Sequence, residues 1–391
     1  MNLAKIYSTQ FDVLNSFVVE VEVDIVKNSG TPTLKIVGLP DKAVEEARER
    51  VVTALKNSNL GKPQIDKIIV SLSPAEEKKT GPIFDLPIAL GYILADGQID
   101  FNPEEKIFLG ELALDGALRK INGVLPMVKI AKENGFKSIY LPQENAPEAA
   151  LISGVNIFPV NSLTQILEHL EQENLKDKNF DKIISPFKNT ENFLEDKKPS
   201  IDFSDVKGQE ISKRALEIAA AGGHNIMMYG APGTGKTMMA RAFTGILPQL
   251  SEKQALEITS IHSAAGALRD EIYISAPPFR SPHHTASYVS IIGGGTYPKP
   301  GEVTLAHNGV LFMDEFVEFD KRVLESLREP LEDNFVNISR AKGTVKFPAN
   351  FILVAAMNPP SEVFRSKSVS FSEEQKFRKK LSGPIMDRID L

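Results

Sequence analysis

The chain has 391 residues, of which 42% are apolar and 25% charged, and its net charge is −6. This length predicts two or three globular domains, and the negative charge argues against general coating of nucleic acid while leaving room for a local basic channel. Cysteine is absent, which excludes disulfides and thiolate metal sites, and neither a signal core nor a membrane span is apparent, so we expect a cytoplasmic protein.

Residues 1–172 are predicted to form one α/β domain. Residues 19–25 alternate apolar and acidic side chains, which is the period of a half-buried strand, and residues 33–37 are predicted to return as its hairpin partner. Helices are predicted at 42–57, 86–94, 126–134 and 162–172, the last with a capping box at 162–165, and strands at 67–72, 138–141 and 155–158.

Residues 173–200 are polar, mixed in charge and without a sustained period, so we predict a linker with a short helical piece at most. From residue 201 the pattern changes to helices that alternate with apolar strands at 226–229, 310–313 and 351–356. Polar residues follow each of these strands. Because functional groups gather at the carboxyl ends of parallel strands, residues 201–391 are predicted to be a second α/β domain with its site at that edge.

The first of these strands opens into a glycine-rich loop with the spacing G-x-x-x-x-G-K-T. The loop comprises Gly230, Ala231, Pro232, Gly233, Thr234, Gly235, Lys236 and Thr237. Its glycines let successive backbone N–H groups surround an anion, and the helix predicted at 238–247 adds its positive dipole end. The lysine can reach β- and γ-phosphates, and the threonine hydroxyl can ligate Mg²⁺. A glycine-rich turn that binds nothing is the alternative, but the flanking strand and helix favour a site for a nucleoside triphosphate such as ATP.

Acidic and amide side chains follow the next two strands. Asp314 can hold the Mg²⁺ shell and Glu315 can polarise an attacking water. Asn358 stands where an amide could read the γ-phosphate. The alternatives are a solvated strand end for the two acids and a simple turn before Pro359 for the asparagine.

The order of these motifs resembles that of the AAA+ ATPases, and specifically their magnesium-chelatase-like branch. The runs SPHHTAS (281–287), GGG (293–295), PGEVTLAHNG (300–309) and LSGPIMDRIDL (381–391) closely resemble the YifB/ComM family, and the likeness covers almost the whole chain. That family includes a bacterial factor of natural transformation. The resemblance implies a P-loop AAA+ core of three αβα layers, and a hexameric ring that hydrolyses ATP to translocate or branch-migrate single-stranded or branched DNA.

The resemblance also assigns roles to residues. It places phosphate binding on Lys236 and Thr237, the first sensor on Asn358 and a finger that reaches a neighbour's ATP on Arg388. A finger supplied by another subunit makes hydrolysis depend on assembly. A structural ion pair of Arg388 with Asp387 or Asp390 is the alternative.

Residues 333–347 are predicted to form a β-hairpin with the basic tip residues Arg340 and Lys342. In related rings such a hairpin projects into the central pore, where basic side chains follow phosphates without reading bases. A solvated basic turn is the alternative. The loop 281–295 contains His283 and His284, which would point apart on an extended chain and so make a poor metal chelate; its glycines suggest mobility.

The first domain resembles the Lon protease domain, which has a ribosomal-protein-like α/β fold. In the similar stretches, Ile83 stands at the position of the nucleophile and Leu125 at that of the lysine, so we expect no protease activity. Ser71, Ser73 and Thr80 would be the hydroxyls to consider if that alignment slipped. We expect the domain to assist assembly or DNA engagement.

Two features depart from the family pattern. Residues 360–367 lack the cysteines that relatives carry, and the chain ends three residues beyond Arg388, so the helical lid and its second sensor arginine are expected to be missing. From this end we expect a truncated form or fragment that binds ATP and hydrolyses it poorly. The alternative functions are a nucleotide-gated scaffold that moves no DNA and a chelatase-like remodeller; the Lon-like residues 1–172 argue against a chelatase.

Overall fold

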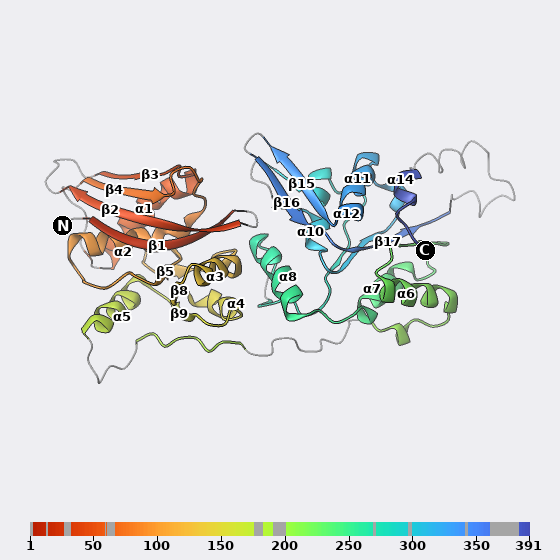
Figure 1. Cartoon of the computed structure of the whole chain (residues 1–391), viewed down its shortest axis with the longest axis horizontal. Helices are drawn as coiled ribbons and strands as arrows, with labels where there is room; N and C mark the ends of the chain where they lie inside the picture. The colour runs from red at the N-terminus through yellow and green to blue at the C-terminus, as the bar shows by residue number, and fades with distance from the viewer. Residues whose placement is uncertain are drawn as a thin grey trace. The chain divides into compact units, whose positions relative to one another are not determined.

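A computed structural model describes residues 3–12, 15–26, 33–58, 60, 67–175, 183–190, 201–268, 271–295, 299–340, 343–359 and 383–391. The chain divides into two compact units, residues 1–193 and 194–391 (Figure 1). Both units mix helices with sheets that contain parallel strands, which confirms the predicted α/β class. Among the described residues, no helix is both long and apolar enough to cross a bilayer.

The first unit is built around a four-stranded sheet in the order β1 (Leu3–Asp12), β2 (Asn15–Val26), β4 (Lys67–Ser73), β3 (Thr33–Val37). Helices α2 (Asp85–Asp96) and α3 (Val124–Glu133) pack on β1 and β2, and α1 (Lys42–Asn57) packs on α2. Gly91 of α2 allows a close approach to β2, since a Cβ there would lie 2.5 Å from the Val23 side chain. The helices predicted in this region are therefore confirmed and cover the sheet.

The predicted pairing of β3 is wrong. β3 pairs in parallel with β4, and β4 lies between it and β2, so β2 and β3 form no hairpin. The unit β3–α1–β4 is a helical crossover, which parallel strands require. β1 was not predicted; it pairs with β2 along its whole length.

A second, parallel sheet of the first unit has the order β5 (Lys106–Phe108), β8 (Ser138–Pro142), β9 (Asn156–Val160). Phe108, Tyr140 and Phe158 stack across it, with ring centroids 5.1 and 4.7 Å apart. The remaining elements are the hairpin β6 (Glu111–Leu112) and β7 (Leu118–Arg119), helices α4 (Ala146–Ala149) and α5 (Leu163–Leu175), and the 3₁₀ turns η1 (Pro82–Phe84) and η2 (Gln143–Asn145).

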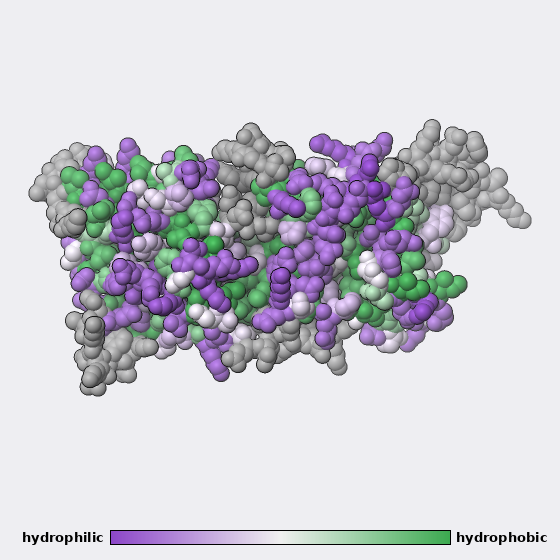
Figure 2. Space-filling view, viewed as in Figure 1, coloured by the Kyte–Doolittle hydropathy of each residue, from purple (hydrophilic) through white to green (hydrophobic). Residues whose placement is uncertain are grey.

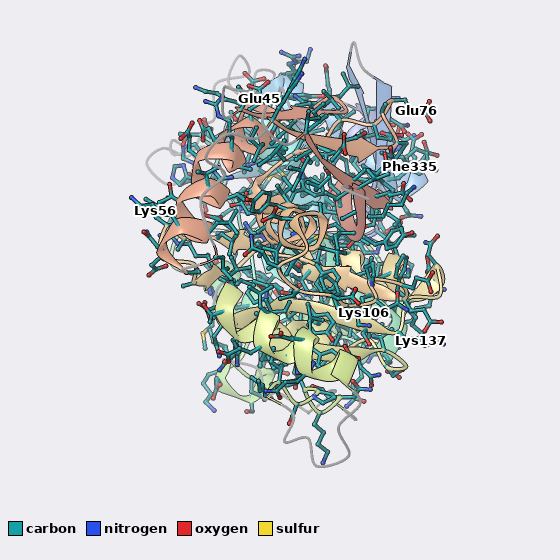
Figure 3. The ribbon with its side chains drawn as sticks, turned by 90° about the vertical axis from the view of Figure 1, so that its left-hand side faces the viewer. Glu45, Lys56, Glu76, Lys106, Lys137 and Phe335 are labelled. Atoms are coloured by element: carbon teal, nitrogen blue, oxygen red, sulfur yellow. The ribbon has the colours of Figure 1, made fainter. Side chains whose placement is uncertain are left out.

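Several charged side chains lie at the ends of these elements. Glu45 lies in the first turn of α1 and Lys56 in its last turn, which suits the helix dipole (Figure 3). Lys137, just before β8, pairs with Glu105 at 2.7 Å. At the start of α5, Ser162 accepts from the N–H of Gln165, but the Gln165 side chain accepts from Asn161, so only half of the predicted capping box forms.

Part of the predicted linker lies against the first unit. In residues 183–190, Ile184 is buried and its N–H donates to Nδ1 of His169. Phe187 donates to the carbonyl of Ile157 in β9 at 2.7 Å. This segment therefore extends the first unit past the end of α5.

The second unit has a four-stranded sheet in the order β10 (Ile226–Tyr229), β17 (Ile352–Met357), β14 (Val310–Met313), β11 (Phe279–Arg280). All three pairings are parallel, as predicted for β10, β14 and β17; β11 was not predicted. Helices α6 (Glu210–Gly222) and α7 (Lys236–Phe243) form a core with the sheet that contains Leu216, Phe243, Phe312 and Val354. The carboxyl ends of β10, β17 and β14 consequently meet at one edge.

The other elements of this unit surround that sheet. They are η3 (Phe203–Asp205), η4 (Thr244–Ile246), α8 (Glu252–Ala264), α9 (Tyr288–Ile292), the short pair β12 (Gly293–Gly294) and β13 (Lys299–Pro300), α10 (Glu302–Leu305), η5 (Phe316–Glu318), α11 (Lys321–Ser326), α12 (Arg328–Asp333), the hairpin β15 (Phe335–Arg340) and β16 (Gly343–Pro348), and α14 (Gly383–Met386). Polar side chains cover much of the face of the second unit seen in Figure 2.

Candidate nucleotide-binding site

The glycine-rich loop joins β10 to α7, and its backbone requires glycine at two positions. Gly233 and Gly235 have φ angles of 80° and 88°. A Cβ at either position would meet no atom within 4 Å, so the constraint is the left-handed backbone and not crowding. Gly235 is the residue before the helix, which directs the first N–H groups of α7 toward the loop.

Lys236 ties this loop to the end of β17. Its side chain is buried, with the residue 8% exposed, and Nζ donates to the carbonyls of Gly230 at 2.8 Å and Ala231 at 2.9 Å. The third hydrogen bond goes to Oδ1 of Asn358 at 2.9 Å. The ammonium group is therefore held inside the concave side of the loop and beside the amide that follows β17.

Thr237 makes the corresponding link to β14. Its hydroxyl donates to Oδ2 of Asp314 at 3.0 Å, while Oδ1 of Asp314 accepts from the N–H of Glu315 at 3.0 Å. Glu315 has φ 50° and ψ 47°, a conformation that residues other than glycine adopt rarely. The turn after β14 therefore places two adjacent carboxylates, those of Asp314 and Glu315, at the carboxyl end of this strand.

The structure brings together four of the residues that the sequence singled out. Lys236 contacts Asn358, and Thr237 contacts Asp314, although about 120 and 80 residues separate the partners in sequence. The register explains the meeting, because Tyr229 pairs with Met357 and Met313 with Ala355, so the three strands end side by side.

Glu315 has a partner that the sequence did not predict. Nδ1 of His284 lies 3.0 Å from Oε2 of Glu315. The expectation that His283 and His284 point apart is wrong: residues 284 and 285 form a turn, and the two ring centroids are 4.2 Å apart. The SPHHTAS run was the available signal, but nothing in its spacing indicates which distant residue it contacts.

Arg388 pairs with Glu332 at the end of α12. Its carbonyl accepts from the side chain of Asn225, whose Oδ1 accepts from the N–H of Leu353 in β17. The side chain of Asp390, one of the two acids predicted as alternatives for pairing with Arg388, instead accepts from the N–H of Asn225. The segment 388–391 is thereby fixed to the start of β10 and β17, and Asn225 is a structural residue that sequence reasoning missed.

The predicted hairpin is confirmed as β15 and β16, with Arg340 paired to Gly343. Lys342, like residues 360–367, lies outside the described residues, and so does the side chain of Arg340. At the base of the hairpin Val336 and Phe347 are buried, and Nζ of Lys346 lies 3.4 Å from the centroid of the Phe335 ring. The hairpin is therefore anchored in the second unit.

In the first unit, Ile83 in η1 and Leu125 in α3 are both buried and bring no nucleophile or amine. The hydroxyl of Thr80 accepts from Nε2 of Gln10 at 3.1 Å. The backbone N–H of Thr80 donates to Oε1 of Gln10. Ser71 and Ser73 belong to β4, where they pair with Glu22 and Glu20 of β2. The contacts of Thr80 fix its hydroxyl to Gln10 of β1.

Comparison with known proteins covers both units. A family model described as magnesium chelatase, subunit ChlI, matches residues 202–391, and one described as subunit ChlI of Mg-chelatase matches residues 21–145. The competence protein ComM of Haemophilus influenzae is 41% identical over all of this chain and 76% of its own length. An uncharacterized Escherichia coli protein, YifB, is 41% identical over all of this chain and 75% of its own length. Lon protease 2 of Bacillus subtilis is 29% identical over 44% of this chain and 37% of its own length.

The match at residues 21–145 carries the name of a chelatase subunit, so the first unit does not by itself separate this chain from the chelatases, contrary to expectation. ComM and YifB, by contrast, match all of this chain at 41% identity. The chain belongs to the YifB/ComM family of magnesium-chelatase-like AAA+ proteins.

Proposed function

We propose that this protein hydrolyses ATP and, as an oligomeric ring, uses the energy to translocate or branch-migrate DNA in the cytoplasm. The observation that carries the ATPase part is the meeting of Lys236 with Asn358 and of Thr237 with Asp314 at one edge of a parallel sheet. Kinship with a competence protein supports the DNA part.

The residues at this edge fit a nucleoside triphosphate and Mg²⁺. The loop offers backbone N–H groups and a nearly buried ammonium group, which suit a polyphosphate. The hydroxyl of Thr237 and the carboxylate of Asp314 are hard oxygen ligands of the kind Mg²⁺ prefers, and they already lie within hydrogen-bond distance of each other. The bound ion would neutralise charge on the phosphates.

The other residues have distinct tasks in this proposal. Lys236 contributes positive charge at the β- and γ-phosphates, and Asn358, fixed by Lys236, orients the γ-phosphate and water. Glu315 accepts a proton from the water as general base. Arg388 of a neighbouring copy adds charge stabilisation, which makes turnover depend on assembly into a ring, expected to be a hexamer.

The hairpin β15–β16 supports the DNA part of the proposal. The hairpin β15–β16 ends in the basic positions Arg340 and Lys342, which suit contacts to a phosphate backbone. A scaffold whose assembly is set by nucleotide, and a chelatase-like remodeller, share the same ATP site. DNA-dependent turnover separates the motor from both.

The test measures steady-state ATP hydrolysis with and without branched DNA, together with strand exchange on a labelled four-way junction. We expect DNA to raise turnover several-fold. We expect the junction to be separated into duplexes only with ATP. Glu315→Gln is the control: it should bind ATP and leave the junction intact. Turnover that DNA does not change, with an intact junction, would refute the motor and favour the scaffold.

A further inference from the structure

Asn225, the residue before β10, joins the segment that carries Arg388 to the parallel sheet. Its side-chain Nδ2 donates to the carbonyl of Arg388 at 2.9 Å, and its Oδ1 accepts from the N–H of Leu353 in β17 at 2.8 Å. One amide group therefore bridges the backbone of the arginine and the strand that leads into Asn358.

The backbone of Asn225 binds the residues that follow the arginine. Its N–H donates to the carboxylate of Asp390 at 2.9 Å, and its carbonyl accepts from the N–H groups of Asp390 and Leu391 at 3.0 and 3.2 Å. The N–H of Met227 in β10 donates to the carbonyl of Leu391 at 3.0 Å. Residues 390 and 391 are thus bound largely through main-chain groups, whereas the Arg388 carbonyl is bound by a side chain that one substitution can remove.

The side chain of Arg388 is less constrained than its backbone. The guanidinium pairs with Glu332 at the end of α12, and the side chain is 28% exposed. The N–H of Arg388 donates to the carbonyl of Ile385 in α14 at 3.0 Å, so both backbone polar groups of the arginine have partners. A guanidinium that leaves Glu332 for the ATP of a neighbouring copy would therefore extend from a backbone that is already fixed.

Charge stabilisation by an arginine depends on where its guanidinium lies. A displacement of about 1 Å at a reacting centre can cost on the order of a hundredfold in rate. The amide of Asn225 ties the arginine to β10, which leads into the glycine-rich loop, and to β17, which leads into Asn358. The position of the arginine is thereby referred to the same two strands that form this subunit's own site.

We propose that Asn225 is a positioning residue for Arg388: its amide holds the arginine-bearing segment where the guanidinium can reach a neighbour's ATP. This inference rests on the proposed function, because it takes Arg388 as the finger. Asn225 lies at the start of β10, and the phosphate loop lies at the other end of that strand. Loss of the amide should therefore leave a subunit's own ATP site intact and disable the site of its neighbour.

The test begins with two substitutions of Asn225. Asn225→Ala removes the amide, whereas Asn225→Asp keeps an acceptor for the N–H of Leu353 and faces the Arg388 carbonyl with an oxygen in place of a donor. Calorimetric titration with a non-hydrolysable ATP analogue should give both variants an affinity within about twofold of the wild type. Their kcat should fall on the order of tenfold or more.

Mixing variants separates a misplaced arginine from damage to a subunit's own site. A Lys236→Ala subunit binds ATP poorly but keeps its arginine, so mixing it with Asn225→Ala should restore part of the turnover. Mixing Asn225→Ala with Arg388→Ala should restore nothing, because neither subunit supplies a correctly placed arginine. Asp390→Asn is the matched control: its amide oxygen can still accept from the N–H of Asn225, so its kcat should stay within about twofold of the wild type.

Wild-type turnover in either variant of Asn225 would overturn the inference. Loss of ATP affinity in both variants, or no restoration of Asn225→Ala by Lys236→Ala, would also overturn it, because the amide would then serve the site of its own subunit. Restoration by Arg388→Ala, or a loss in Asp390→Asn as large as in Asn225→Ala, would do the same. The mixture of Lys236→Ala with Arg388→Ala tests the finger itself: no restoration there would refute that part of the proposed function, and the inference would fall with it.

Discussion

The ammonium group of Lys236 and the amide of Asn358 are in direct contact at the proposed site, and the two groups have different roles there. Lys236 donates to two loop carbonyls and to Asn358, so it both shapes the loop and positions the amide. Removing the lysine leaves the loop without its internal cation. Removing the amide leaves the loop intact.

We therefore expect Lys236→Ala to weaken ATP binding at least tenfold, because it removes the charge that faces the phosphates. Asn358→Ala should keep ATP affinity within about threefold and lower kcat on the order of tenfold or more. Calorimetric titration with a non-hydrolysable ATP analogue measures the first quantity and steady-state turnover the second. Equal loss of affinity in both variants would show that Asn358 supports the loop and does not act on the phosphate.

At the scale of residues, the sequence was informative where a pattern is local. The spacing of Gly230, Gly235, Lys236 and Thr237 predicts a glycine-rich loop between a strand and a helix. The structure has this loop between β10 and α7. The contacts of His284 with Glu315 and of Arg388 with Glu332 were missed. Each of these joins segments more than 30 residues apart, and no periodicity encodes such a pairing.

At the scale of elements, the first unit contains a buried ion pair that fastens two helices and a strand. Nε of Arg50 in α1 donates to Oδ2 of Asp85 in α2 at 2.6 Å, and Nη2 donates to Oδ1 at 3.0 Å. Oδ2 also accepts from the N–H of Leu112 in β6. The carboxylate is fully buried and the side chain of Arg50 is 20% exposed.

Asp85→Ala should destabilise these helices by about 3 kcal/mol, because it leaves a mostly buried guanidinium without its partner. Hydrogen exchange of α1 and α2 in rising urea reports this free energy. The matched control is Arg48→Ala, which removes an exposed pair with Glu49 at 2.9 Å and should cost less than about 0.5 kcal/mol. Similar costs for the two variants would mean that the buried pair contributes no more than a surface pair.

The hairpin β15–β16 gives a second prediction at this scale. Lys342→Ala should weaken DNA binding and reduce DNA-stimulated turnover, with ATP binding unchanged, because a tip lysine would contact only phosphates. The control is Lys346→Ala: Nζ of Lys346 lies over the Phe335 ring at the hairpin base, so its loss should leave DNA affinity within about twofold. DNA affinity in salt titrations checks both. Unchanged affinity in Lys342→Ala would remove the hairpin tip from the mechanism.

Element types were easier to predict than element pairing. The helix at 42–57 and the strands at 226–229 and 310–313 were found with the observed limits, because amphipathic period and apolar runs mark them. β3 was assigned to the wrong neighbour, because chain proximity favoured a hairpin over the crossover through α1. β1 was missed because its polar residues, among them Ser8, Thr9 and Gln10, are buried and hide the alternation.

At the scale of the whole molecule, Arg388 can serve its own subunit or a neighbouring one, and the two roles predict different behaviour. Within one chain it pairs with Glu332, and the segment around it is fixed by Asn225. An arginine whose only task is this pair would be needed inside its own subunit. An arginine that acts on a neighbour's ATP would be needed in another subunit, and the two cases differ in how inactive variants behave when mixed.

We expect Arg388→Ala and Lys236→Ala to be nearly inactive alone and partly active when mixed, because a Lys236→Ala subunit can lend its arginine to the intact site of an Arg388→Ala subunit. Turnover per subunit of the wild type should also rise with protein concentration, since an isolated copy lacks a neighbour's arginine. Glu332→Gln is the matched control: it breaks the pair inside the chain and leaves Arg388 in place, so it should retain most of the activity. If mixing restores nothing and Glu332→Gln is as inactive as Arg388→Ala, then Arg388 serves the fold of its own subunit. Hydrolysis would then not depend on a neighbour's arginine. Assembly into a ring would need a reason other than completion of the ATP site.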